Sequence, residues 1–128
     1  MNQPTTMTII VSRPLPDAAV IKINGEVDQD ALMGENREYS GLPNDNVLDT
    51  ILAGSVEPPC KLAIIDLTET RFLSSLAVAT LVRFRTHVAP KGVSVRIAAG
   101  SKMIGLLKLA RLEMLISIFA DVPAALRG

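Results

Sequence analysis

Two adjacent serines, Ser74 and Ser75, are the residues of this chain whose type and position best suit a chemical modification site. They follow the apolar pair Phe72-Leu73 and precede a helical pattern. Serine is a good N-cap because its hydroxyl accepts hydrogen bonds from the free backbone N–H groups of the first helical turn. A helix N-terminus is also electropositive and therefore suits an anion such as a phosphate. The two serines are consequently either a modification site or no more than helix caps.

The stretch from Lys61 to Val88 supplies the elements that must position these serines. The run Leu62 to Ile65 is continuously apolar and ends at Asp66, which is typical of a strand buried on both faces. A polar link, Thr68 to Arg71, follows. Beyond the serines, helical spacing directs four residues to the core: Ala77, Leu81, Phe84 and Val88. The stretch is therefore predicted to be a strand, a link and a helix.

Three further apolar residues of this helix, Leu76, Val78 and Val82, fall partly outside the core-facing stripe. Additional apolar residues on a helix either pack against another element or form a binding patch. The sequence leaves both options open.

The N-terminal part of the chain predicts an antiparallel hairpin. Strands are expected at Met7 to Val11 and at Ala18 to Ile23. The intervening stretch from Arg13 to Asp17 contains two prolines and is expected to be a turn. Asn24-Gly25 indicates a turn or a bulge.

An irregular acidic excursion is expected from Gln29 to Asn46, because acids dominate and glycine, proline and asparagine interrupt the pattern. A short helix at Gln29 to Met33 fits within it. A helix through about Ala53 follows, with Asp45 or Asn46 as its cap. Its buried stripe is expected to contain Val47, Leu48, Ile51 and Leu52.

Strands and helices alternate in the last third of the chain. A strand at Val93 to Ala98, a helix at Lys102 to about Ala110 and a short strand at Leu115 to Phe119 precede a terminal helix at Val122 to Leu126, capped by Asp121. Such alternation implies right-handed crossovers and parallel strands. The prediction is a single α/β domain over residues 1–128, with one mixed sheet of about four to five strands flanked by about four helices.

The composition supports a globular protein, with 48% hydrophobic and 20% charged residues. Aromatic residues make up only 3%, so stacking surfaces for nucleic acid are lacking and no nucleic-acid partner is expected. Charge is uneven along the chain: residues 1–60 have a net charge of −6 and residues 61–128 a net charge of +6. The halves could attract one another or present two faces to partners, and ordinary surface charge explains the split equally well.

Enzymatic and metal chemistry have little support. Cys60 is the only cysteine, which excludes an internal disulfide and a cysteine metal cluster. His87 is the only histidine, and no phosphate-binding glycine motif is present. No apolar run reaches the roughly 20 residues that span a bilayer, and no signal peptide is evident. We expect a cytoplasmic, non-enzymatic protein without cofactor, metal or membrane insertion.

Three segments resemble the STAS domain, the fold of anti-sigma factor antagonists and of the cytoplasmic tails of sulfate transporters. Gly25-Glu26-Val27-Asp28 resembles the family's G-E-[LVF]-D at the end of an early strand. Residues 64–68 and 72–78 resemble its strand, loop and F-[IVM]-D-S-[ST]-G-[LV] helix start. Residues 105–113, with 118–119 and 125–126, resemble its closing helix, strand and helix. The resemblance runs from about residue 7 to the end.

This resemblance implies a regulatory role. In the antagonists, a serine at the helix N-terminus is phosphorylated by an anti-sigma kinase, and the dephosphorylated protein binds the anti-sigma factor and frees the sigma factor. On the match Ser75 takes the phosphorylated position, and Ser74 is the substitute. The implied partner-binding residues are Asp28, Asp66, Ser74, Ser75, Leu76, Val78 and Val82, with the two aspartates near the serine, where they would repel the phosphate or bind the kinase's metal.

The motif departs from the family at three positions: Ser74 replaces an Asp, Leu76 replaces a Ser or Thr, and Ala77 replaces a Gly. A second interpretation is therefore a STAS subunit that is not switched and makes constant contacts in a signalling scaffold or a transporter complex. A third, a small-ligand or nucleotide sensor, rests on family analogy alone. A second copy of this chain, forming a homodimer, is a further option for the binding partner.

Overall fold

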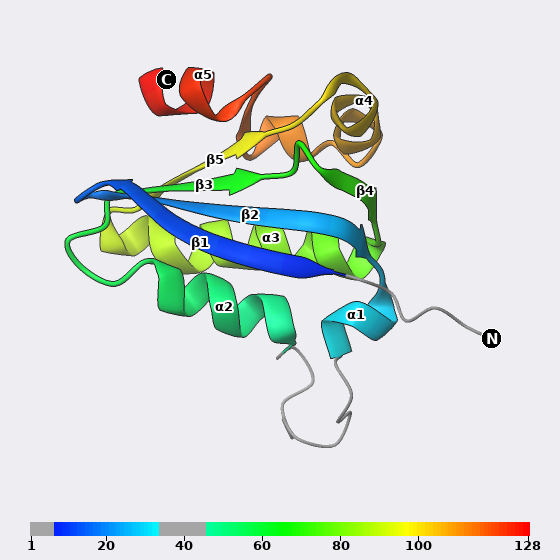
Figure 1. Ribbon diagram of the computed structural model, residues 1–128, viewed down its shortest axis with the longest axis horizontal. Coiled ribbons are helices and arrows are strands. Elements are labelled where there is room, and N and C mark those ends of the chain that lie inside the picture. Colours follow the sequence, from blue (N-terminus) through cyan, green and yellow to red (C-terminus); the bar gives the residue numbers. More distant parts are fainter. Residues whose placement is uncertain (1–6, 34–45) are drawn as a thin grey trace.

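The computed structural model describes residues 7–33 and 46–128, and its strands form one mixed sheet (Figure 1). The strands are β1 (Thr8–Leu15), β2 (Ala18–Val27), β3 (Leu62–Asp66), β4 (Thr70–Leu73), β5 (Ser94–Ala98) and β6 (Ser117–Phe119). The α-helices are α1 (Gln29–Met33), α2 (Val47–Ser55), α3 (Ser75–Val88), α4 (Ser101–Leu109) and α5 (Val122–Arg127). Two 3-10 turns lie at Ala89–Lys91 and Leu112–Met114.

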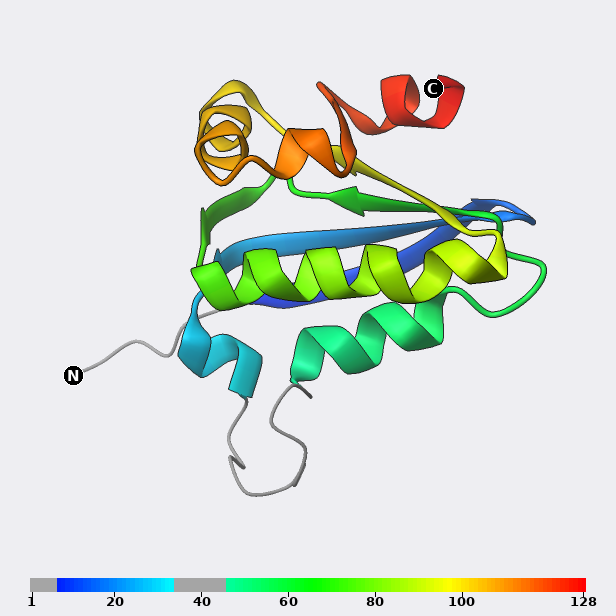
Figure 2. The same ribbon diagram turned by 180° about the vertical axis from the view of Figure 1, so that it is seen from behind.

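The sheet has the order β1-β2-β3-β5-β6, and β4 pairs with the far end of β2. β1 and β2 form an antiparallel hairpin, whereas β2, β3, β5 and β6 run parallel, so the expected mixed sheet is confirmed. Figures 1 and 2 show α1, α2 and α3 on one side of the strands and α4 and α5 on the other.

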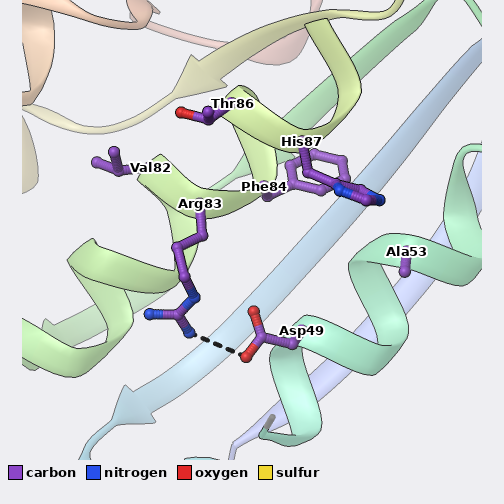
Figure 3. Close-up of a pocket in the computed structure, with 7 residues that line it drawn as sticks. All are labelled: Asp49, Ala53, Val82, Arg83, Phe84, Thr86 and His87. Carbon is purple, nitrogen blue, oxygen red and sulfur yellow. Dashed lines mark hydrogen bonds and ion pairs between the residues drawn. The ribbon is translucent and has the colours of Figure 1, made fainter. Parts of the chain in front are cut away.

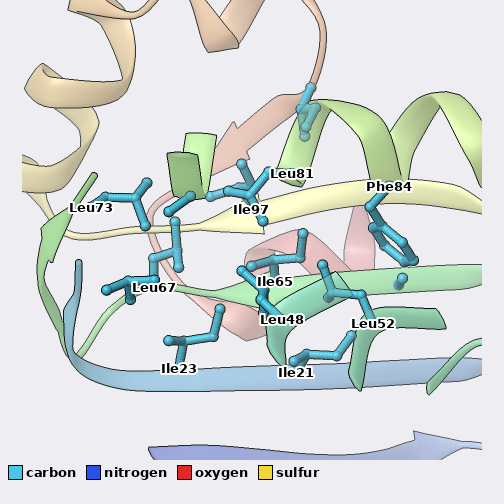
Figure 4. Packing of buried hydrophobic residues seen from close by; sticks show 14 of the residues in the cluster. Ile21, Ile23, Leu48, Leu52, Ile65, Leu67, Leu73, Leu81, Phe84 and Ile97 are labelled. Atoms are coloured by element: carbon cyan, nitrogen blue, oxygen red, sulfur yellow. The ribbon is translucent and has the colours of Figure 1, made fainter. Parts of the chain in front are cut away.

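The main core lies between the sheet and helices α2 and α3 (Figure 4). Ile21, Ile65 and Ile97 are register partners on β2, β3 and β5, so their side chains form one row on this face. The row packs in a cluster with α3, whose predicted core residues are all buried: Ala77, Leu81, Phe84 and Val88.

The opposite face of the sheet carries a smaller cluster, in which Val20 and Ile64 pack with Ala125 of α5. Since β3 contributes Ile64 to one face and Ile65 to the other, both of its sides are buried. This arrangement accounts for the continuous apolar run in the sequence and confirms the predicted buried strand.

The turn predicted from Arg13 to Asp17 was wrong in its extent, because the observed turn is shorter. β1 continues through Arg13 and Pro14 to Leu15, with an irregular register between Ser12 and Leu15. Proline is tolerated there because β1 is at the edge of the sheet, where its missing N–H costs no interior ladder bond. The chain then turns at Pro16-Asp17.

Residues 7–33 and 46–128 form six strands and five α-helices, slightly more than the predicted four to five strands and about four helices. The predicted polar link contains the start of β4, and β2 extends past Ile23 to Val27. Of the two options predicted for Asn24-Gly25, a turn or a bulge, the structure has the bulge: β2 continues through both residues, Gly25 has a φ of 94°, and the β2–β4 register shifts between Gly25 and Glu26. Of the predicted acidic excursion, Gln29–Met33 is α1 and residues 34–45 lie outside the described residues.

Candidate functional site at the start of helix α3

The two serines occupy different positions at the start of α3. Ser74 is the N-cap, and its Oγ accepts a hydrogen bond from the Ala77 backbone N–H at 3.2 Å. Ser75 is the first helical residue and is exposed to solvent. Ser74 therefore holds the helix end, while Ser75 is the serine that another protein can reach without disturbing the cap.

The end of β2 positions this helix start. Val27 and Leu73 are register partners on β2 and β4, and the Ser74 N–H donates to the Val27 carbonyl at 2.9 Å. Asp28 follows Val27 directly, and its Oδ1 accepts from the Ala31 N–H at 2.8 Å. The structure thus brings Asp28 and the serine pair, which come from distant parts of the sequence, to adjacent strand ends.

Two opposing electrostatic influences act on Ser75, the positive pole of α3 and the nearby Asp28 carboxylate. α3 is 14 residues long, and none of the described residues in its first turn is acidic. The positive pole of the helix is therefore not offset by its own side chains. The carboxylate on the neighbouring strand end, Asp28, is held at the start of α1 and adds a fixed negative charge to the same region.

Asp66 is not brought to the serines. It is 6% exposed, and its Oδ1 accepts from the Thr68 N–H at 2.9 Å and from the Thr68 hydroxyl at 2.6 Å. Strand alternation puts its side chain on the same face as Ile64, opposite the face that α3 covers. Its register partner Lys22 also lies about 16 Å before Val27 along an extended strand. The geometry gives Asp66 a structural role in the β3–β4 turn.

Leu76, Val78 and Val82 are each half-buried and pack against the main core. The packing option is therefore confirmed for part of each side chain. Because part of each side chain remains exposed, the binding-patch option stays a prediction for all three residues.

A groove of about 540 Å³ lies between α2 and α3 (Figure 3). It is lined by Asp49, Ala53, Val82, Arg83, Phe84, Thr86 and His87. The Arg83 Nη2 atom lies 2.9 Å from the Asp49 Oδ2 atom, so an ion pair joins the two helices along the groove. Val82 lines this groove and is also one of the predicted partner-binding residues, whose binding role stays a prediction.

A buried polar contact, which the sequence analysis missed, joins the same two helices. Asn46 caps α2, and its Nδ2 donates to the Thr80 Oγ1 at 2.9 Å. Thr80 in turn donates to the Leu76 carbonyl at 2.8 Å, and Asn46 and Thr80 are both buried. The sequence did contain a sign that Thr80 is buried, because Thr80 falls on the same helical face as the predicted core residues Ala77 and Leu81.

Thr80→Val should lower the free energy of unfolding by about 1–3 kcal/mol, because it removes the acceptor for a buried amide while keeping the side-chain shape. Thr86→Val is the matched control: it lies on the same helix but is exposed, so a change within about 0.5 kcal/mol is expected. Urea denaturation of both variants measures the difference. Equal destabilisation by both would contradict the assigned role of Thr80.

Known structures share this arrangement of elements. An anti-sigma factor antagonist from Mycobacterium paratuberculosis superposes with a TM-score of 0.74 at 18% identity, covering 99% of this chain and 97% of that one. An uncharacterised protein with a SpoIIAA-like fold from Shewanella loihica superposes with a TM-score of 0.50 at 21% identity, covering 99% and 96%. Both are of the STAS type, so the predicted STAS-like fold is confirmed.

No protein-family model and no curated protein matched the sequence. Among residues 7–33 and 46–128, no helix has the length and apolar character needed to cross a membrane.

Proposed function

We propose that this STAS-fold protein is a cytoplasmic regulatory binding module of the anti-sigma factor antagonist type. It binds an anti-sigma factor with serine kinase activity through the start of α3, and phosphorylation of Ser75 releases it. The observation that carries the proposal is the exposed Ser75 hydroxyl at the N-terminus of a long helix whose cap is a different serine. The likeness of the fold to an anti-sigma factor antagonist supports it.

The switch has a direct physical basis. A phosphate adds about −1.5 to −2 charges at neutral pH. In the free domain, the helix pole and the surrounding water accommodate that charge. In a complex, the phosphate loses water and meets any acidic group of the interface, so binding weakens. Phosphorylation can therefore block the partner without unfolding the domain.

The neighbouring residues have separate roles in this proposal. Asp28 contributes a fixed negative charge that opposes a phosphate within a closed interface. Leu76 and Val78 supply apolar contact area, which Val82 continues toward the groove between α2 and α3. Ser74 is the less suitable target, because a phosphate on it would disturb a cap contact worth about 1 kcal/mol.

Intact-protein mass spectrometry tests the proposal. The protein is incubated with ATP, Mg²⁺ and each anti-sigma kinase of its own organism, and added phosphate is mapped by peptide analysis. We expect one phosphate on Ser75, lost in Ser75→Ala and retained in Ser74→Ala. No added phosphate with any kinase, despite a stable complex with one of them, would contradict the switch.

That negative result would favour a second candidate, a binding module that makes constant contacts in an assembly. The observation in its favour is that the half-exposed Leu76 stands beside Ser75, where the family has a small polar residue. An apolar contact at this position would strengthen a permanent interface. The two candidates share the surface and differ in whether Ser75 controls it.

A further inference from the structure

β1 has a strand partner on one side only in the described part of the chain, since it stands at one end of the sheet order (Figure 1). The opposite edge is β6, which is only 3 residues long. On β1, Ile10 is 57% exposed and Val11 is 39% exposed. An edge strand presents unpaired backbone N–H and C=O groups and is therefore a template for another strand.

Proteins usually protect such an edge with charged side chains, proline or a bulge. The stretch Thr8–Ser12 has no charged residue and no proline, and four of its residues are β-branched. The register irregularity and Pro14 come only after Ser12. The Arg13 side chain does not protect the edge from pairing with another strand either, because its Nη1 is directed to the Ser55 carbonyl, to which it donates at 2.7 Å. Within the described part of the chain, Thr8–Ser12 is thus an unpaired sheet edge with high strand propensity.

This segment matches itself in antiparallel register. When two copies are paired about Ile10, Ile10 faces its own counterpart, Ile9 faces Val11, and Thr8 faces Ser12. Every aliphatic residue meets an aliphatic residue and every hydroxyl meets a hydroxyl, and such cross-strand pairs stabilise a sheet. Because the segment is uncharged, two copies do not repel one another.

We propose that β1 is a homodimer interface, in which two copies pair antiparallel at Thr8–Ser12 about a two-fold axis at Ile10. The two sheets then form one continuous sheet. Ile10, whose register partner is Lys22, lies on the face opposite the main core, whereas Val11 pairs with the core residue Ile21 and lies on the helix-covered face. Pairing would cover apolar surface on both faces. The interface shares no residue with the Ser75 surface.

Sedimentation velocity, from micromolar to near-millimolar concentration, tests the dimer. We expect reversible association of the 13.7 kDa chain to twice its mass. Ile10→Lys should weaken it at least about tenfold, because the two-fold axis sets two like charges directly opposite one another. Leu109→Lys is the control, since Leu109 is an apolar residue of α4 that is 88% exposed and lies outside the proposed interface. The Leu109→Lys variant should therefore dimerise as strongly as the wild-type protein.

A pair of variants with opposite charges at residue 10 tests the proposed register of the two β1 strands. Ile10→Lys and Ile10→Glu should each be monomeric alone and should form a heterodimer when mixed, because residue 10 faces residue 10 only in the proposed pairing. Circular dichroism of each variant verifies its fold. A wild-type protein that stays monomeric throughout, a dimer unaffected by Ile10→Lys, or a mixture that stays monomeric would each overturn the proposal.

Discussion

Ser75→Asp should weaken binding of the anti-sigma partner by about a hundredfold or more, whereas Ser75→Ala should change it only a few-fold. A charge buried without a counterpart at an interface costs about 2–5 kcal/mol, and a hundredfold loss corresponds to about 2.7 kcal/mol. Alanine has little effect because Ser75 is exposed and is not the cap of α3. Isothermal titration calorimetry with the kinase identified by phosphorylation measures both affinities.

Val78→Asp provides the comparison that separates the two candidate functions. Val78 lies one turn further along α3 and is half-buried, so a charge there should reduce binding whether or not Ser75 is a switch. Near-normal binding of Ser75→Asp, together with loss of binding in Val78→Asp, would establish the constant-contact module. Normal binding of both variants would remove the start of α3 as the partner surface. Thermal unfolding of each variant verifies that the domain is intact.

Leu81→Ala should lower the free energy of unfolding by about 2–5 kcal/mol. Leu81 of α3 is 0% exposed and belongs to the same buried cluster as the row of isoleucines on the sheet, so its removal leaves a cavity where the helix meets the strands (Figure 4). Leu109→Ala is the matched control, because the same atoms are removed from an exposed position, where a change within about 0.5 kcal/mol is expected.

Guanidinium denaturation, monitored by far-ultraviolet circular dichroism, measures this difference. The transition midpoint of Leu81→Ala should fall while its slope stays the same, since the surface exposed on unfolding hardly changes. A loss below about 1 kcal/mol for Leu81→Ala would mean that α3 is not packed on the sheet as described.

The predictions from sequence succeeded where the determining interactions are local. Asp121 was predicted as a helix cap, and Asn46 and Ser74 were each one of two adjacent candidates. In the structure the side chain of each of these three residues accepts from a backbone N–H three residues on. Capping depends on one residue type and a few backbone atoms, so it can be predicted without knowing the fold. The core stripe of α3 follows in the same way from helical periodicity.

The features that were missed depend on partners distant in sequence. β4 is a strand because its last residues pair with the end of β2, and Thr70–Leu73 alone is too short and mixed to indicate this. Pro14 belongs to a strand only because β1 is at the sheet edge. Thr80 has a structural role because it accepts a hydrogen bond from Asn46, which lies 34 positions away in the chain. Tertiary context decides each of these cases.

Asp66 shows how a motif can group residues that the fold separates. The family resemblance assigned it to the neighbourhood of the serines, but its register and the alternation of β3 place its side chain on the other face of the sheet. The alternation of Ile64, Ile65 and Asp66 predicts that Asp66 shares a face with Ile64, but the fold is needed to know which face α3 covers. The structure therefore groups Asp28 with the serine pair and leaves Asp66 apart, and the partner-binding role of these residues stays a prediction.

The pairing of β2 with three strands also determines how the protein must form. Only β1 is close to β2 in sequence, and the next parallel neighbour, β3, begins at Leu62. The entropy of closing that long crossover is lost before its contacts compensate, so we expect this mixed α/β domain to fold more slowly than a helical bundle of similar size. During synthesis, one edge of β2 has no parallel partner until β3 has left the ribosome, so we expect an interval in which this unpaired edge is exposed to other chains and to chaperones.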